Sequence, residues 1–340
     1  MIIACDIKNR YIQASQADKT ADYFCPGCRE KVILKSGDIK QKHFSHCIGS
    51  TCATFTENET LQHLVGKIEI ADNVQQYGQI QIEAVLPNIQ QRPDILLICE
   101  NKKIAIEYQC SPISQQKLNQ RNEGYKKENI QVIWILGDNY FKRRMSQASI
   151  IKFMKDNALI FYLPEKKHFV HRQQFTKPDF TGVKFTEHIS KALFNIELSP
   201  QRKNLNLSKQ VYKLQHLIMQ RRIEPRLVDY LYQNNRLLIH APTWIHEGNT
   251  FGLKISNWHW RLIAVLFLEK IGQQNIVNKQ QLSEKLSIFL LGNEKFKQQK
   301  IADLYHDLEI NNYILQHGNY ILVRRLPRWK NEKQQKTLKI

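Results

Sequence analysis

Residues 92–113, RPDILLICENKKIAIEYQCSPI, contain the pattern most informative about the fold of this chain. It contains two apolar runs separated by a short polar turn, a pattern that predicts two adjacent β-strands. Asp94 begins the first run, and Glu107 lies inside the second, two residues before Gln109. Because alternate residues of a strand share a face, we expect Glu107 and Gln109 on one face, with Asp94 at the same end of the sheet.

The residues on either side complete an α-β-β-β-α-β order. The segment Thr56-Glu57-Asn58-Glu59 matches a capping box, which predicts the start of a helix. Alternating and continuous apolar runs predict strands, and Ser111-Pro112 precedes a polar helix. The expected elements are a helix from Thr56, strands at 79–86, 94–99 and 103–110, a helix at 111–129, and a strand at 130–136. This order indicates an α/β (α+β) sheet with crossover helices.

The acidic residues of these strands suggest a divalent metal site. Asp94 and Glu107 would converge, and carboxylate oxygens are the ligands that Mg²⁺ prefers. A bound metal can supply a hydroxide for attack on a phosphodiester. Glu59 and His63 lie four residues apart on the preceding helix, so they could add an acid and a proton carrier. Glu59 is equally explained by the capping box and Asp94 by a strand start, whereas burying Glu107 is costly unless it is paired.

A second set of candidate ligands lies near the N-terminus. The pairs Cys25-x2-Cys28 and His43-x2-His46 have a spacing that suits a tetrahedral Zn²⁺ site, which would stabilise a small module. Cys47 and Cys52 compete with them as ligands. The alternative is a reduced pair of turn cysteines.

Cysteine usage and hydropathy indicate a cytosolic protein. Seven cysteines are an odd number, which argues against a secreted disulfide framework. Cys99 and Cys110 are expected to be buried thiols without a function. The N-terminus has no secretory leader, and the longest aliphatic block, residues 262–268, is too short to span a bilayer.

Charge is distributed unevenly along the 340 residues. Residues 1–140 carry 16 Lys and Arg against 16 Asp and Glu, so the net charge of +19 belongs to residues 141–340. A basic surface of this size attracts a polyanion, of which nucleic acid is the most common in the cytosol. A solvated basic face without a partner is the alternative.

The C-terminal half is expected to be mostly helical. Residues 141–250 are basic and rich in Gln and Asn, and residues 251–340 show three helical patterns and a hairpin, the order of a winged helix. Candidate DNA contacts are Arg324, Arg325 and Arg328. The tail after Pro327 is expected to be loose, and Trp258 and Trp260 are expected in the core.

Several motifs together closely resemble the competence protein CoiA family. They are the segments Arg92-Pro93-Asp94, Ile106–Ser114, Arg121–Tyr125 and Ile133–Gly137, with Cys25–Cys28 and His43–His46. The resemblance covers residues 20–140. It implies a PD-(D/E)xK nuclease core at 56–140, after a zinc-finger-like module at 1–55 and before the basic helical region at 141–250 and the winged-helix-like region at 251–340.

The resemblance also implies roles for single residues. Asp94 would be the Asp of the motif, Glu107 its second acid and Glu59 the helix acid, while Gln109 stands where lysine is usual. Glutamine can position water but supplies no cation. Independently of the family, Arg121 and Tyr125 lie four residues apart on a helix and could contact a phosphate, although a surface arginine is an equal explanation.

The expected function is that of a cytoplasmic, Mg²⁺- or Mn²⁺-dependent deoxyribonuclease with a structural Zn²⁺. By resemblance, it acts on incoming single-stranded or branched DNA in natural transformation, together with recombination proteins. One alternative is a non-catalytic DNA-binding mediator of recombination with the same fold. Another is a repair or restriction endonuclease.

Overall fold

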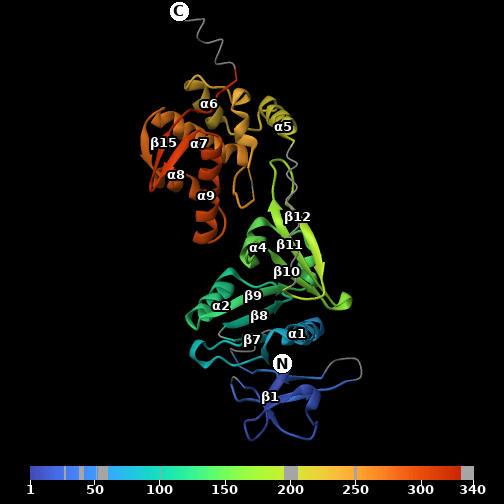
Figure 1. The fold of residues 1–340 in the computed structure, drawn as a ribbon. Coiled ribbons are helices and arrows are strands. Elements are labelled where there is room, and N and C mark those ends of the chain that lie inside the picture. The colour runs from blue at the N-terminus through green and yellow to red at the C-terminus, as the bar shows by residue number, and fades with distance from the viewer. Residues whose placement is uncertain are drawn as a thin grey trace, which may run out of the picture. The chain divides into compact units, whose positions relative to one another are not determined.

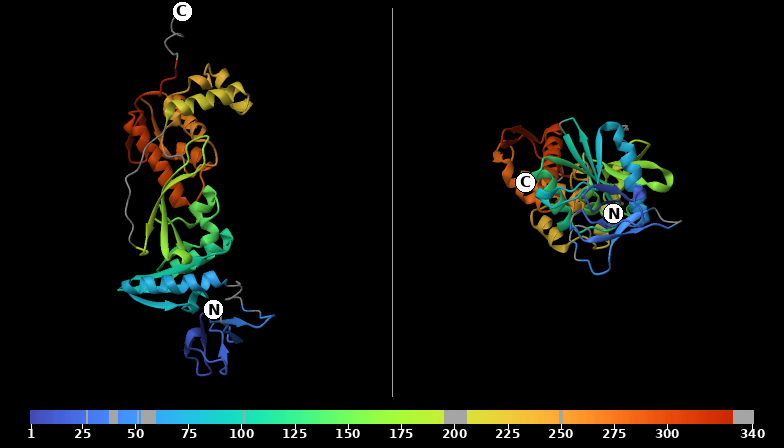
Figure 2. Two further views of the ribbon diagram at one scale, coloured as in Figure 1. Left: turned by 90° about the vertical axis from the view of Figure 1, so that its right-hand side faces the viewer. Right: turned by 90° about the horizontal axis from the view of Figure 1, so that it is seen from below.

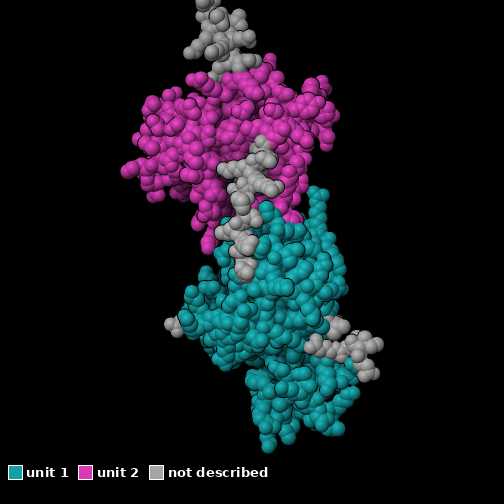
Figure 3. Space-filling model, turned by 45° about the vertical axis from the view of Figure 1, so that its right-hand side comes forward, with its two compact units in different colours: residues 1–146, 152–173, 186–199 teal, residues 147–151, 174–185, 200–340 magenta. Residues whose placement is uncertain are grey.

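The structure is a computed structural model that describes residues 1–26, 28–37, 42–50, 52, 60–100, 102–194, 206–248 and 251–330. It divides into two compact units, which Figure 3 colours separately. Unit 1 comprises residues 1–146, 152–173 and 186–199, and unit 2 comprises residues 147–151, 174–185 and 200–340. No helix in these described ranges is long and apolar enough to cross a membrane.

Unit 1 begins with a five-stranded sheet in the order β2-β1-β3-β4-β5 (Figure 1). The strands are β1 (Ile3–Cys5), β2 (Tyr11–Gln13), β3 (Tyr23–Phe24), β4 (Lys31–Lys35) and β5 (His43–His46). A small core forms beneath them, in which Tyr23, Val32 and Phe44 are buried. The N-terminal region is therefore strand-rich.

The main sheet has seven strands in the order β12-β11-β10-β9-β8-β7-β6. They are β6 (Gln79–Ile82), β7 (Ile95–Cys99), β8 (Lys102–Gln109), β9 (Ile130–Leu136), β10 (Leu159–Leu163), β11 (His168–Thr176) and β12 (Lys184–Ser190). Strands β6, β7 and β8 pair antiparallel, whereas β8, β9 and β10 run parallel. In the β7–β8 ladder Ile95 is opposite Ile106, which places Asp94 near Glu107 at one end of the sheet.

Two helices cover opposite faces of this sheet (Figures 1 and 2). α1 (Leu61–Val74) packs Ile70 and Val74 into the cluster that contains Ile106. α2 (Gln115–Lys127) buries Leu118 and Tyr125, and Tyr125 packs into a different cluster on the other face. Shorter helices follow: α3 (Asp138–Phe141), α4 (Gln147–Phe153), and the 3₁₀ helices η1 (Ala14–Gln16), η3 (Gln75–Tyr77), η4 (Pro87–Ile89), η5 (Pro164–Lys166), η6 (Leu238–His240) and η7 (Thr243–His246).

The predicted α-β-β-β-α-β order is confirmed by α1, β6, β7, β8, α2 and β9. The predicted capping box at Thr56 and Glu59 lies outside the described residues. In the part that is described, Thr60 caps α1, and its hydroxyl accepts a hydrogen bond from the His63 amide at 3.3 Å. Ser114 caps α2 in the same way.

The expectation of a mostly helical segment at 141–250 is wrong for its first half. Residues 159–190 instead form β10, β11 and β12 and extend the main sheet. The reason is visible in β11, where buried and partly exposed residues alternate from His171 to Thr176 as they do in a half-buried strand. The second half is helical, with α5 (Leu207–Met219) and α6 (Pro225–Gln233).

The C-terminal segment has the winged-helix order that its sequence indicated. Its elements are α7 (Asn257–Ile271), β13 (Ile276–Asn278), α8 (Lys279–Ser287), α9 (Glu294–Ile310), β14 (Ile314–His317) and β15 (Tyr320–Val323). The strands form a sheet in the order β13-β15-β14. Asn278 caps α8 and Asn293 caps α9, each by accepting a backbone hydrogen bond.

Two contacts tie this segment together. The Asp179 carboxylate accepts hydrogen bonds from the Asn257 and Trp258 amides at 2.7 and 2.9 Å, and so caps α7. The indole of Trp329 is buried and donates to Glu269 at 2.6 Å. The tail is therefore anchored as far as Trp329, which corrects the expectation that it is loose directly after Pro327.

Candidate functional site

Asp94 lies at the start of β7 and is fixed by the neighbouring strand. Its Oδ2 accepts a hydrogen bond from the Tyr108 amide of β8 at 2.9 Å. The side chain is 16% exposed, so the carboxylate is largely withdrawn from solvent without being sealed off. The strand ladder thus sets the orientation of this predicted catalytic acid.

Helix α1 brings two more groups to Asp94. Gly66 permits the close approach of α1 to β8, because a Cβ at this position would lie 2.3 Å from Cε1 of Tyr108. His63, which was predicted to act here, has its Nε2 3.3 Å from Asp94 Oδ2 and stacks on the Tyr108 ring. Lys67 places its Nζ 3.0 Å from Asp94 Oδ1.

Lys67 also contacts Glu83, and these residues were not predicted as part of the site. Lys67 Nζ lies 2.8 Å from Glu83 Oε1, and both residues are almost fully buried. Glu83 in turn pairs with Arg92 and accepts backbone hydrogen bonds from Ile2 and Ile3. We call Lys67, Glu83 and Asp94 the Lys67 triad.

A signal for Lys67 is present in the sequence. It is spaced by three and four residues from Leu64 and Ala71, both of which are buried on the inner face of α1. A lysine in such a stripe must find a counter-charge, because an unpaired buried charge is very costly. The position of Glu83, by contrast, depends on tertiary packing and on a left-handed backbone conformation with φ of 55°.

Glu107 is buried on the α2 side of the sheet. Arg121 Nε donates to its Oε1 at 3.1 Å, and the Tyr125 hydroxyl donates to the same oxygen. Burial raises the pKa of Glu107 above its ordinary value; the Arg121 charge opposes this rise, and Asp94 adds to it. The structure therefore explains how a carboxylate is accommodated inside an apolar strand.

This arrangement changes the expectation for Arg121 and Tyr125 as phosphate contacts. Tyr125 is completely buried, so its hydroxyl serves Glu107 and does not face solvent. Arg121 is engaged by Glu107 and also donates to the Arg92 carbonyl at 2.9 Å. The sequence grouped these two residues correctly, but their common partner is an acid of the protein.

Gln109 lies two residues beyond Glu107 on the same strand and is buried. Its Nε2 donates to the Ser111 carbonyl at 2.7 Å, which turns the amide toward the segment that follows β8. Glu59, the predicted helix acid, lies outside the described residues.

Asp94 and Glu107 fit a hard divalent cation in ligand type. They lie at the same end of the sheet, and the negative charge of Asp94 contributes to the raised pKa of Glu107, so the two carboxylates interact. Each carboxylate also has a cationic partner, Lys67 or Arg121, which would compete with a metal. Within the described residues, the two acids do not belong to a cluster of three or more close metal-ligand side chains.

The N-terminal region does contain such a cluster. Ligand atoms of Cys25, Cys28, His46 and Cys52 all lie within 4.8 Å of one another. Cys28 Sγ is 3.3 Å from His46 Nε2, and Cys25 Sγ is 4.0 Å from Cys52 Sγ. Three thiols and one imidazole form a set that is typical of structural zinc sites.

Cys52 is the fourth member of this cluster, in place of the predicted His43. Both histidines lie on β5, where Lys35 is opposite His43 and Val32 is opposite His46. Positions three apart on a strand point to opposite faces, so His43 cannot join His46 on the side of the cysteines. Cys47 is exposed and also lies outside the cluster.

Burial affects the protonation of this cluster. It raises the pKa of the Cys28 thiol and lowers the pKa of His46. The imidazole is therefore prepared to bind a metal as a neutral ligand. The thiol must lose its proton when the metal binds.

The predicted DNA contacts of unit 2 lie after β15. Arg324, Arg325 and Arg328 are exposed. Arg325 donates to the Asn311 carbonyl at 2.7 Å and lies over the Tyr313 ring. Both contacts are made by the guanidinium of a residue that is exposed overall.

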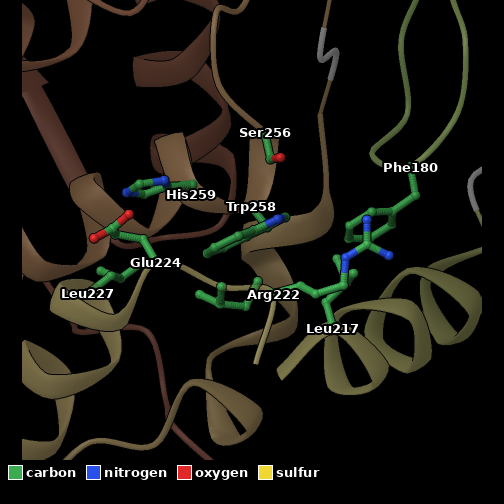
Figure 4. A pocket seen from close by; sticks show the side chains of 9 residues that line it. Phe180, Leu217, Arg222, Glu224, Leu227, Ser256, Trp258 and His259 are labelled. Atoms are coloured by element: carbon green, nitrogen blue, oxygen red, sulfur yellow. The ribbon is translucent and has the colours of Figure 1, made fainter. Parts of the chain in front are cut away.

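Unit 2 also contains a pocket of about 240 Å³ beside α7. Trp258 contributes to it, whereas Trp260 is buried and donates to the Leu286 carbonyl. The pocket is lined by Phe180, Leu217, Arg222, Ile223, Glu224, Leu227, Ser256, Trp258 and His259 (Figure 4). The expectation of a core role is thus met by Trp260, while Trp258 also faces a cavity.

Taken as a whole, unit 1 has the features of a nuclease-like protein: an α-β-β-β-α-β core with an acid on each of two neighbouring strands, preceded by a Cys and His cluster that could hold zinc. Comparison with protein families agrees. Residues 6–55 match the N-terminal domain of competence protein CoiA, and residues 59–200 match its nuclease-like domain. The two matches together span more than half of the chain, which belongs to the CoiA family.

Among curated proteins, the chain is similar to competence protein CoiA of Bacillus subtilis (strain 168). The two are 30% identical over 221 residues, which cover 60% of this chain and 59% of that relative. The match thus spans less than two thirds of the relative's length. No solved structure matches the chain significantly.

Proposed function

We propose that this protein is a metal-dependent deoxyribonuclease that processes single-stranded or branched DNA during natural transformation. The observation that carries the proposal is the placement of Asp94 and Glu107 at one end of adjacent strands, in a domain that matches a nuclease-like family. The role in transformation comes from the family. Mg²⁺ or Mn²⁺ would polarise the scissile phosphate and lower the pKa of the attacking water.

The residues of the chain would act around that metal. Asp94 and Glu107 would hold it, with Glu59 as a further acid. Gln109 donates its amide N–H to Ser111, which leaves its carbonyl oxygen to accept a hydrogen bond from the attacking water. His63, held beside Asp94, could take up the proton that this water loses.

Unit 2 would supply much of the DNA affinity. The excess positive charge lies in residues 141–340, and Arg324, Arg325 and Arg328 are exposed there. Phosphate contacts by such residues release counterions, so binding of DNA should weaken as the salt concentration rises.

Zn²⁺ held by Cys25, Cys28, His46 and Cys52 would stabilise the N-terminal sheet. We place the protein in the cytoplasm, with recombination proteins as its partners.

A second candidate function is a DNA-binding mediator of recombination without cleavage. The ion pairs of Asp94 with Lys67 and of Glu107 with Arg121 favour it, because they neutralise the carboxylates that would hold the metal. Gln109 favours it as well, since this position lacks a cation.

Cleavage assays separate the two functions. Labelled single-stranded, duplex and branched DNA would be incubated with the protein in Mg²⁺, Mn²⁺ or EDTA. The test variant is Asp94→Asn/Glu107→Gln, which keeps side-chain size. The matched control is Glu123→Gln, which neutralises an exposed acid on α2.

Cleavage that needs metal, that survives in the Glu123 variant and that is lost in the double variant supports the nuclease. DNA binding measured in Ca²⁺ must remain in the double variant for this reading to hold. Absence of cleavage by the wild-type protein on every substrate, with DNA binding intact, would establish the mediator instead.

A further inference from the structure

Gln109 stands where the nuclease motif usually has a lysine, but a different lysine, Lys67 of α1, lies next to Asp94. Lys67 Nζ lies 3.0 Å from Asp94 Oδ1, and the lysine is only 1% exposed. It reaches Asp94 from α1, whereas Gln109 lies on β8. A positive charge therefore stands beside the candidate metal ligand although the strand position carries a neutral amide.

Glu83 alone does not account for this lysine. The Glu83 carboxylate already pairs with Arg92 and accepts hydrogen bonds from the Ile2 and Ile3 amides, at 3.1 Å to Oε2 in each case. One arginine is enough to balance the charge of one carboxylate. The charge of Lys67 is thus in excess of what Glu83 requires, and Asp94 is a second acid within ion-pair distance of it.

Burial of this lysine also has a cost that a simpler residue would avoid. Its neighbours on the inner face of α1, Leu64, Ile70 and Ala71, are apolar and fully buried. Replacing a buried ion pair by well-packed apolar residues is often neutral or stabilising. A stability role alone would therefore be served as well by an apolar residue at position 67 together with a neutral residue at position 83.

We propose that Lys67 is a positioning residue of the nuclease site, which orients Asp94 and supplies the fixed positive charge that Gln109 does not. This inference rests on the proposed nuclease function. Contacts on both oxygens orient the Asp94 carboxylate: Lys67 holds Oδ1, and the Tyr108 amide and His63 contact Oδ2. Its geometry is thereby set before a metal or DNA arrives.

Two opposite effects should result from removing Lys67. Without the ammonium, Asp94 loses its orientation, and cleavage should fall by about a hundredfold, as when a single preorganised electrostatic contact is removed. Mn²⁺ binding should tighten by about tenfold, because a cation next to the metal ligand no longer opposes it. If Lys67 only stabilised the fold, its removal would weaken Mn²⁺ binding, since a disordered site binds Mn²⁺ more weakly.

The experiment compares wild-type protein with three test variants and one control variant. Lys67→Met removes the charge, and Lys67→Met/Glu83→Gln also neutralises the acid that would otherwise lose a buried partner, so it guards against failure to fold. Lys67→Met/Gln109→Lys moves the lysine to the strand. Lys126→Met, an exposed lysine on α2, is the control. Each variant is measured for DNA cleavage in Mn²⁺, for Mn²⁺ affinity by calorimetry, and for thermal unfolding.

The inference is supported if Lys67→Met or Lys67→Met/Glu83→Gln loses cleavage while binding Mn²⁺ more tightly. It also requires that Lys67→Met/Gln109→Lys cleaves DNA at least tenfold faster than Lys67→Met. It is overturned if these variants cleave as the wild type does, or if cleavage and Mn²⁺ affinity fall together with thermal stability. A wild-type protein that does not cleave at all overturns the nuclease proposal, and this inference with it. Failure of the nuclease proposal can be distinguished from failure of the Lys67 inference alone. In the first case neither the wild-type protein nor the Asp94→Asn/Glu107→Gln variant cleaves DNA, whereas in the second case the wild-type protein cleaves DNA and the double variant does not.

Discussion

Arg121 donates from Nε to Oε1 of Glu107 across 3.1 Å, and this ion pair lies where an apolar strand would otherwise bury a lone carboxylate. Removing one partner of a buried pair leaves the other charge uncompensated. We expect Arg121→Met to lower the free energy of unfolding by about 3 kcal/mol, since breaking such a pair costs about 3–5 kcal/mol and Arg121 is partly exposed.

Urea denaturation followed by fluorescence measures this effect, and Arg143→Met, at an exposed position, is the matched control. The double variant Arg121→Met/Glu107→Leu should recover most of the loss, because it removes both charges. Equal stability of the Arg121 and Arg143 variants would show that the ion pair adds nothing.

The zinc cluster predicts which ligands matter. Cys52→Ser should abolish binding of one Zn²⁺ per chain, whereas His43→Ala should retain it, because His43 lies on the opposite face of β5. Metal content by mass spectrometry and the visible absorption of the Co²⁺ form measure this. Cys47→Ser serves as the cysteine control, and loss of metal from the His43 variant would restore the Cys₂His₂ assignment.

The packing of α1 on β8 depends on Gly66. A Cβ there would lie 2.3 Å from the Tyr108 ring, so Gly66→Ala should force the helix away from the strand. Overpacking of this kind costs about 1–3 kcal/mol, and we expect about 2 kcal/mol in urea denaturation. Gly37→Ala is the control, because no atom of the described residues lies within 4 Å of its added methyl group. Equal losses in both variants would contradict the close approach.

Acid should weaken the fold through His171. This residue of β11 is fully buried, and burial lowers the pKa of His171 to about 4 from 6.5. The folded state therefore binds fewer protons than the unfolded state, so stability is complete above pH 6.5 and falls as the pH drops toward 4. The loss is about 3 kcal/mol at most, at about 1.4 kcal/mol for each pH unit.

His171→Phe should flatten this part of the stability curve, whereas His306→Gln, at an exposed position, should leave it unchanged. Urea midpoints measured between about pH 4 and pH 7.5 would show the difference. The same slope in wild type and His171→Phe would mean that other groups cause the acid sensitivity.

The exposed arginines of unit 2 should act through charge. Replacing Arg324, Arg325 and Arg328 by alanine should reduce the slope of log affinity against log salt, by about 0.7 for each phosphate of single-stranded DNA that is no longer neutralised. Fluorescence anisotropy at several salt concentrations measures it. The control, Lys8→Gln/Arg10→Gln/Lys19→Gln, removes the same charge from the N-terminal region. An equal effect of both triple variants would show that net charge alone matters.

Local patterns were enough to predict much of this fold. The strand at 130–136 and the helix at 257–271 have the bounds that their sequences indicated, because apolar periodicity and capping residues act within a few positions. Strands β10 and β11 were missed because their surroundings are basic and rich in amides, which hides a short apolar run at 159–163 and an alternation that begins only at His171.

The candidate site was predictable in part. Its acids could be found because a carboxylate inside an apolar run requires an explanation, but the partners of Glu107 and Asp94 come from helices on opposite faces of the sheet. Glu83 and Arg92 pair only once the chain is folded. The fourth zinc ligand could have been predicted as Cys52, because His43 and His46 lie three residues apart on one strand and so point to opposite faces.

The cap that Asp179 provides for α7 affects how this molecule can be divided. A fragment that starts at residue 200 or 251 would contain every helix and strand of the winged-helix segment and would still lack the carboxylate that satisfies the first amides of α7. Limited proteolysis between the units should therefore not release a stable C-terminal half.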